Sequence, residues 1–78
     1  MTDRLIELFA NVLGVEPESL SEQTSPENTP NWDSLSNIML LTEIEAVFSV
    51  ELNTSDIESM SSIGRTRAVL ERHGVSDR

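Results

Sequence analysis

The tripeptide Asp33-Ser34-Leu35 is the part of the chain whose residue types point most directly to chemistry. It stands between a stretch rich in proline and serine and a long apolar run with helical spacing, which places the Ser34 hydroxyl at the start of a helix. The free N–H groups and the positive dipole end of a helix N-terminus would stabilise a phosphate ester there. The pattern therefore predicts that Ser34 is modified. The alternative is that Asp33 or Ser34 only caps the helix and is not modified.

The composition is that of a small acidic protein without thiols. A chain of 78 residues corresponds to one domain and is too short to build both a core and a catalytic cleft, so we expect no catalytic residues. The net charge is −9, with −11 over residues 1 to 64 and +2 over residues 65 to 78. Such a chain is expected to avoid nucleic acid and anionic membranes and to dock on basic protein surfaces.

The composition leads to three further expectations, about metal binding, His73 and location. There is no cysteine and no calcium-loop spacing, so we expect no metal site. His73, the only histidine, is expected at the surface near the end of the last helix. No apolar run is long enough to cross a membrane, and a cytoplasmic monomer is the default expectation.

Apolar spacing divides the chain into four helices, which predicts an all-α fold. The expected ranges are about 2–13 for the first helix, 14–33 for a long loop, 34–48 for the second helix, about 55–60 for a short third helix and about 62–73 for the last. Gly14 and Gly74 are expected to end the first and last helices. Three prolines exclude regular structure from most of the loop, which Val15, Leu20 and Trp32 should anchor.

The run from residue 34 to residue 48 has two apolar faces when its residues are placed at 100° intervals. The face expected in the core holds Leu40, Leu41, Ile44, Val47 and Phe48. The second face holds Leu35, Met39, Thr42 and Ala46, with Glu43 and Glu45 on its flanks. Because this second face begins beside Ser34, we interpret it as a docking surface for partner enzymes; contact with the long loop is the alternative.

The order of these parts resembles the acyl carrier protein family over roughly residues 3 to 73. The resemblance is carried by Leu13-Gly14-Val15-x-Pro17-Glu18-x-Leu20, Trp32-Asp33-Ser34-Leu35, Ile44-Glu45-x-x-Phe48, Val50-Glu51-Leu52 and Ser61-Ser62-Ile63-Gly64. It implies a four-helix bundle whose third helix is short. It also implies a 4′-phosphopantetheine arm on Ser34, transferred from coenzyme A by a phosphopantetheinyl transferase that uses magnesium in its own active site.

The resemblance further assigns roles to neighbouring residues. Asp33 would cap the helix and help the transferase recognise it, while Leu35 and Met39 would contact partner enzymes. Cargo tucked between the helices would be lined by Phe9, Leu41, Ile44, Phe48, Ile57 and Ile63.

The resemblance predicts a carrier that is not itself an enzyme. It would present thioester-bound acyl groups to acyl-loading, condensing or acyltransferase enzymes of fatty acid, polyketide or related specialised biosynthesis. Trp32 replaces a usually smaller residue, and Ser36, Asn37 and Met39 stand where acids are common, which favours a specialised acyl or aminoacyl pathway. The alternatives are an aminoacyl or peptidyl carrier, and an acidic helical adaptor without an arm.

Overall fold

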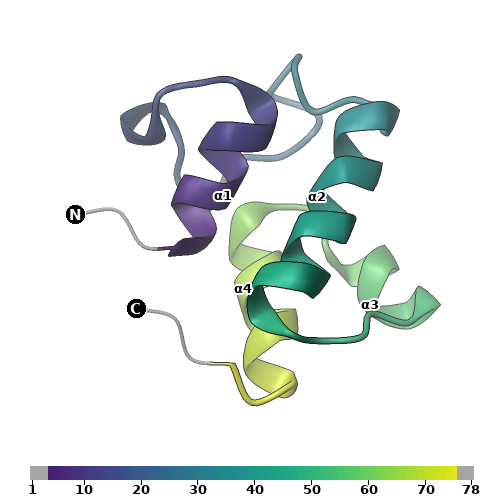
Figure 1. Ribbon diagram of the computed structural model, residues 1–78. Helices are drawn as coiled ribbons and strands as arrows, with labels where there is room; N and C mark the ends of the chain where they lie inside the picture. Colours follow the sequence, from purple (N-terminus) through teal and green to yellow (C-terminus); the bar gives the residue numbers. More distant parts are fainter. Residues whose placement is uncertain (1–3, 76–78) are drawn as a thin grey trace.

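Four α-helices and one 3₁₀ turn are present in the computed structural model, which describes residues 4–75 (Figure 1). They are α1 (Arg4–Leu13), η1 (Pro17–Ser19), α2 (Ser34–Phe48), α3 (Thr54–Ser59) and α4 (Ile63–Arg72). No strand occurs in this part of the chain, and the prediction of an all-α fold is confirmed. The expected start of the first helix at residue 2 lies outside the described residues.

Local side-chain hydrogen bonds explain where the shorter helices begin. At α3, the Asp56 amide donates to Oδ1 of Asn53 at 2.8 Å, and the Asn53 amide donates to Oδ2 of Asp56 at 3.3 Å. This reciprocal capping box starts α3 at Thr54, one residue before the expected position. At α4, the Arg65 amide donates to Oγ of Ser62 at 3.1 Å, so Ser62 is the cap and the helix begins one residue after it.

The core is formed where α1, α2 and α4 meet (Figure 1). Its buried apolar side chains are Leu5, Ile6, Leu8, Phe9, Leu13, Trp32, Leu40, Ile44, Phe48, Met60, Ile63, Val69 and Leu70. Val47 was expected in this core, and that prediction is wrong, because its side chain is 41% exposed. Val47 lies at the edge of the inward face of α2, where α1 and α2 leave a groove at the surface.

The long loop between α1 and α2 is fixed to the start of α4 by backbone and side-chain contacts. The Ile63 amide donates to the Thr24 carbonyl at 3.0 Å, and the Gly64 amide donates to the Glu22 carbonyl at 2.9 Å. The guanidinium of Arg67 also donates to both carboxylate oxygens of Glu22, each at 3.0 Å. These contacts hold the loop in one conformation although most of it has no regular structure.

Two features are absent from residues 4–75. None of the helices combines the length and the apolar composition needed to span a lipid bilayer. Within residues 4–75, no three His, Asp or Glu side chains come together in a way that would hold a metal ion.

Candidate functional site

Ser34 is the first residue of α2, and its side chain is exposed to solvent. Within residues 4–75, no side chain or backbone group forms a hydrogen bond with its hydroxyl. The helix N-terminus adds a positive electrostatic potential at this position. The structure therefore leaves the hydroxyl available for an incoming electrophile at the place where a phosphate ester is electrostatically favoured.

Asp33 determines where α2 begins. Its carboxylate accepts a hydrogen bond from the Ser36 amide at 2.9 Å, and its backbone carbonyl accepts the first helical bond, from the Asn37 amide, at 2.9 Å. The Ser36 amide lowers the pKa of the exposed Asp33 carboxyl below its ordinary value. Asp33 is thus the cap at neutral pH and carries a negative charge beside Ser34.

Trp32 and Asn31 connect the segment before Ser34 to the body of the protein. The Trp32 ring is buried and makes an edge-on contact with Phe9 of α1, with ring centroids 5.1 Å apart. The side-chain amide of Asn31 donates to the Leu13 carbonyl at 3.0 Å, at the end of α1. The loop therefore enters α2 from a rigid anchor, and the anchoring role expected for Trp32 has a structural basis.

The side of α2 that begins at Leu35 is exposed and apolar. Leu35 is 68% exposed and Met39 is 47% exposed, and Thr42 and Ala46 are exposed as well. Ile38, which the sequence analysis did not include, is 61% exposed and belongs to the same face. We call Leu35, Ile38, Met39, Thr42 and Ala46 the outer face of α2. The three-residue spacing from Leu35 to Ile38 is a sequence signal that could have identified this missing member.

The two acidic residues expected on the flanks of this face have different environments. Glu43 is exposed to solvent. Glu45 is half-buried, and one of its carboxylate oxygens accepts a hydrogen bond from the Leu52 amide at 2.9 Å. Glu45 therefore helps to fix the connection between α2 and α3, which makes Glu43 the more accessible acid for a partner.

The residues expected to line a cargo site do not all lie together. Phe9, Ile44, Phe48 and Ile63 are buried in the core, and Leu41 packs partly buried against it. Ile57 on α3 is 37% exposed and is not part of this cluster. Because these core side chains are close-packed, cargo would have to displace them to enter.

A further polar cluster links α3 to the end of α4. Nε2 of His73 lies 2.8 Å from Oδ2 of Asp56, and a guanidinium nitrogen of Arg72 lies 3.5 Å from Oδ1. The hydrogen bond with His73 is the largest cause of a lowered pKa at Asp56, followed by the Asn53 amide. The sequence analysis placed His73 at the surface and missed this carboxylate partner, which lies 17 residues away.

Comparison with known proteins identifies the family of the chain. The family model described as the phosphopantetheine attachment site matches residues 3–70. The chain is also similar to an acyl carrier protein of Syntrophobacter fumaroxidans, with 29% identity over 63 residues that cover 81% of this chain and 78% of that protein. The family match covers most of the sequence and confirms the resemblance. The chain belongs to the acyl carrier protein family, whose prosthetic group is a covalently attached 4′-phosphopantetheine.

Proposed function

We propose that Ser34 carries the 4′-phosphopantetheine arm, and that the protein presents cargo on this arm to enzymes of fatty acid, polyketide or related specialised biosynthesis. The supporting observation is the exposed Ser34 hydroxyl, which no residue in the described part of the chain engages. Asp33 and Leu35 are exposed on either side of it. The arm therefore fits at Ser34 without displacing a packed side chain. When bound, it supplies a thiol that holds acyl groups as thioesters.

The attachment itself requires a separate enzyme, a phosphopantetheinyl transferase with coenzyme A as donor. Oγ of Ser34 forms the new ester bond to phosphorus, adenosine 3′,5′-bisphosphate leaves, and the transferase accepts the hydroxyl proton. In this step Asp33 has two roles. Its bond to the Ser36 amide fixes the first turn of α2, and its charge is available for recognition by the transferase. The chain is thus a substrate of the transferase and a carrier afterwards.

The outer face of α2 is the surface we propose for docking to partner enzymes. Its exposed apolar side chains begin next to Ser34, and no charged residue occurs between Ser34 and Thr42. Glu43 is the next acid along α2 and is exposed. A partner that matches this surface has apolar side chains near the serine and basic side chains further along α2. Loading, condensing and acyltransferase enzymes would all use this face in turn.

Aminoacyl or peptidyl cargo is the second candidate for the same carrier. It is favoured by Trp32 before the tripeptide and by the uncharged first turns of α2, in place of the acids common in carriers of primary fatty acid synthesis. The pocket that the family resemblance suggests, between the core side chains and Ile57, remains our proposal for long acyl chains. The cytoplasmic location expected from the sequence stays a prediction.

The attachment at Ser34 can be tested by mass spectrometry of the intact protein. Incubation with a phosphopantetheinyl transferase, Mg²⁺ and coenzyme A should add the mass of one phosphopantetheine. Ser34→Ala should remove this gain. The matched control is Ser55→Ala, because Ser55 is also an exposed serine in the first turn of a helix, α3, and should leave the gain intact.

The result also separates a carrier from an acidic adaptor. An unchanged mass for the folded wild-type protein would favour the adaptor. A gain that persists in Ser34→Ala would move the arm to another residue. Peptide mapping after proteolysis would then identify that residue.

A further inference from the structure

Asn37 of α2 has a side-chain amide with one end occupied and the other end open. The indole Nε1 of Trp32 donates a hydrogen bond to Oδ1 of Asn37 at 3.1 Å. Because an indole nitrogen is only a donor, this bond fixes which way the amide is turned. Nδ2 is on the other branch of the amide, and no group within residues 4–75 accepts a hydrogen bond from it. The half-buried side chain thus holds an oriented N–H donor without a protein acceptor.

Both partners of this bond are fixed by other contacts. The Trp32 ring is buried against Phe9, and the Trp32 amide donates to the Thr29 carbonyl at 2.9 Å. The Asn37 amide donates to the Asp33 carbonyl at 2.9 Å, within the first turn of α2. The orientation of the Asn37 side chain is therefore set before anything binds to it.

Asn37 and Ser34 are neighbours on the surface of α2. Residues three apart in a helix lie about 60° apart around its axis, with about 5–6 Å between their Cβ atoms. A phosphate on Oγ of Ser34 and Nδ2 of Asn37 both extend beyond their Cβ atoms, so a hydrogen bond spans this gap. Ile38, the neighbour at four residues, has no side-chain donor. Asn37 is thus the side-chain donor of α2 beside the hydroxyl of Ser34.

The charges near Ser34 give such a donor a purpose. Residues 14 to 48 contain no lysine, arginine or histidine. The carboxylate of Asp33, which caps α2, lies directly before the serine. A phosphodiester on Ser34 carries a negative charge of its own, and a hydrogen bond to a charged acceptor is stronger than one between neutral groups. A neutral amide donor therefore offsets part of the repulsion between the phosphate and Asp33.

We propose that Nδ2 of Asn37 donates a hydrogen bond to a phosphodiester oxygen of the arm on Ser34, and that Trp32 is the positioning residue that orients this donor. The inference rests on attachment at Ser34. It also assigns a side of α2 to the arm. At 100° per residue, Asn37 lies on one side of Ser34, and the outer face of α2 lies on the other. The first part of the arm is held on the Asn37 side, which leaves the outer face uncovered for partners.

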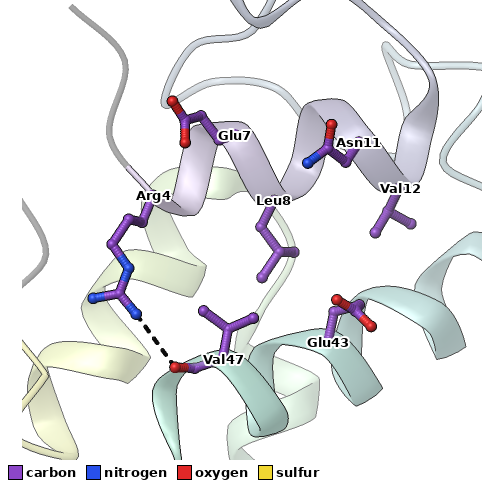
Figure 2. Close-up of a pocket in the computed structure, with 7 residues that line it drawn as sticks. All are labelled: Arg4, Glu7, Leu8, Asn11, Val12, Glu43 and Val47. Carbon is purple, nitrogen blue, oxygen red and sulfur yellow. Dashed lines mark hydrogen bonds between the residues drawn. The ribbon is translucent and has the colours of Figure 1, made fainter.

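The groove between α1 and α2, with a volume of about 210 Å³, lies on a different side of α2 (Figure 2). Glu43 and Val47 are the α2 residues that line it. At 100° per residue, both are about half a turn around the helix from Ser34. Loading should therefore leave the backbone amides of Glu43 and Val47 unchanged, and they serve as an internal reference.

The hydrogen bond can be tested by NMR on ¹⁵N-labelled protein before and after loading with phosphopantetheine. One side-chain amide proton of Asn37 should move downfield, and its exchange with water should slow by about tenfold. The matched control is Asn53, whose Oδ1 is also occupied, by the Asp56 amide at 2.8 Å. Asn53 precedes α3, and its side-chain protons should not respond. An Asn37 side chain that does not respond in fully loaded protein would refute the proposal.

Variants of Asn37 separate the donor from the bond to Trp32. Asn37→Asp keeps an acceptor for the indole but replaces the donor with a charge, and Asn37→Leu removes both groups without adding charge. In loaded protein, both should move the ³¹P resonance toward its position in loaded protein unfolded in urea. Trp32→Phe, which frees the amide to turn, should move it part of the way. Asn53→Asp makes the same chemical change at the cap of α3 and should not move it.

The indole proton of Trp32 shows whether each Asn37 variant keeps the native arrangement around the ring. A ³¹P resonance at the wild-type position in both folded Asn37 variants would overturn the proposal. Intact mass is measured on every sample and separates this inference from the proposed function. A mass that does not rise refutes attachment at Ser34 and the role of Asn37 with it. A loaded protein without the expected changes refutes the role of Asn37 alone.

Discussion

The indole Nε1 of Trp32 donates a hydrogen bond to Oδ1 of Asn37 at 3.1 Å, across the start of α2. The bond joins the residue two positions before Ser34 to the residue three positions after it. Together with the edge-on contact to Phe9, it holds the serine between α1 and the first turns of α2.

Trp32→Phe should therefore lower the stability of the folded protein and slow the attachment of the arm at Ser34. The phenyl ring retains apolar contact with Phe9 but loses the bond to Asn37, so the free energy of unfolding should fall by about 1–2 kcal/mol. Urea denaturation measures this change. In a double-mutant cycle with Asn37→Ala, a coupling of about 0.5–1 kcal/mol is expected. Additive effects would show that the hydrogen bond contributes nothing.

Gly64→Ala tests the contact between the long loop and α4. Alanine normally stabilises a helix by up to about 1 kcal/mol relative to glycine. Here the new Cβ would lie 3.1 Å from the Glu22 carbonyl oxygen, which is held by the Gly64 amide at 2.9 Å. Because this oxygen cannot retreat without lengthening its hydrogen bond, we expect a net loss of about 1–2 kcal/mol in the free energy of unfolding.

Hydrogen exchange provides a local check on the same variant. The Ile63 and Gly64 amides, which bond to the loop, should exchange faster in Gly64→Ala. If Gly64→Ala is as well protected from exchange as the wild type, or is more stable, the loop can move away from the new Cβ without a loss of folding free energy.

The pair of Asp56 and His73 should make stability depend on acid pH. His73, and then the Asn53 amide, lower the pKa of Asp56 from its ordinary value of 3.8. A carboxyl with a lowered folded-state pKa contributes stability that is present above pH 3.8 and is lost as the pH falls through the folded value. The free energy of unfolding should therefore decline below about pH 4.

Urea titrations at several pH values can assign this decline to Asp56. Asp56→Asn should lower stability at pH 7 and flatten the decline in acid, and His73→Gln should flatten it in part. The control is Glu58→Gln, which removes an exposed carboxyl from the same helix. An acid decline of the same size in Asp56→Asn and in the wild type would exclude Asp56 as its source.

Ile38→Asp and Met39→Glu should impair partner enzymes more than folding. Both side chains are exposed on the outer face of α2, so stability should change by less than about 0.5 kcal/mol. A charge inside an apolar contact should reduce kcat/KM for the transferase or a loading enzyme by about tenfold, equivalent to about 1.4 kcal/mol. Ala68→Glu on α4 is the matched control. A lowered melting temperature with unchanged kinetics would assign these residues to folding instead.

Much of the fold was predictable because the signals are local. Apolar spacing identified the four helices, and glycines marked two of their ends: Gly14 and Gly74 both have positive φ, at 69° and 85°. The start of α2 at Ser34 follows from Asp33, which caps the helix through an amide three residues away. These features involve residues within one or two helical turns of each other, so the sequence pattern contains them.

The candidate site was predictable only in part. Most of the outer face of α2 followed from residue spacing, but excluding Val47 from the core required knowing how closely α1 approaches α2. Glu45 was expected to face a partner, and its bond to the Leu52 amide depends on the path of the chain after α2. Ile38 was absent from the predicted face although its three-residue spacing from Leu35 places it there, and the structure shows that it is 61% exposed.

The sequence by itself determined an all-helical chain with a serine at the start of its second helix, because capping and periodicity act between neighbouring residues. Only the tertiary structure decided what holds that serine in place and which side chains line the groove between α1 and α2. The Trp32 contact with Phe9, the Glu22 pair with Arg67 and the groove beside Val47 each join residues far apart in the chain. Such contacts depend on how whole helices pack, which local patterns do not specify.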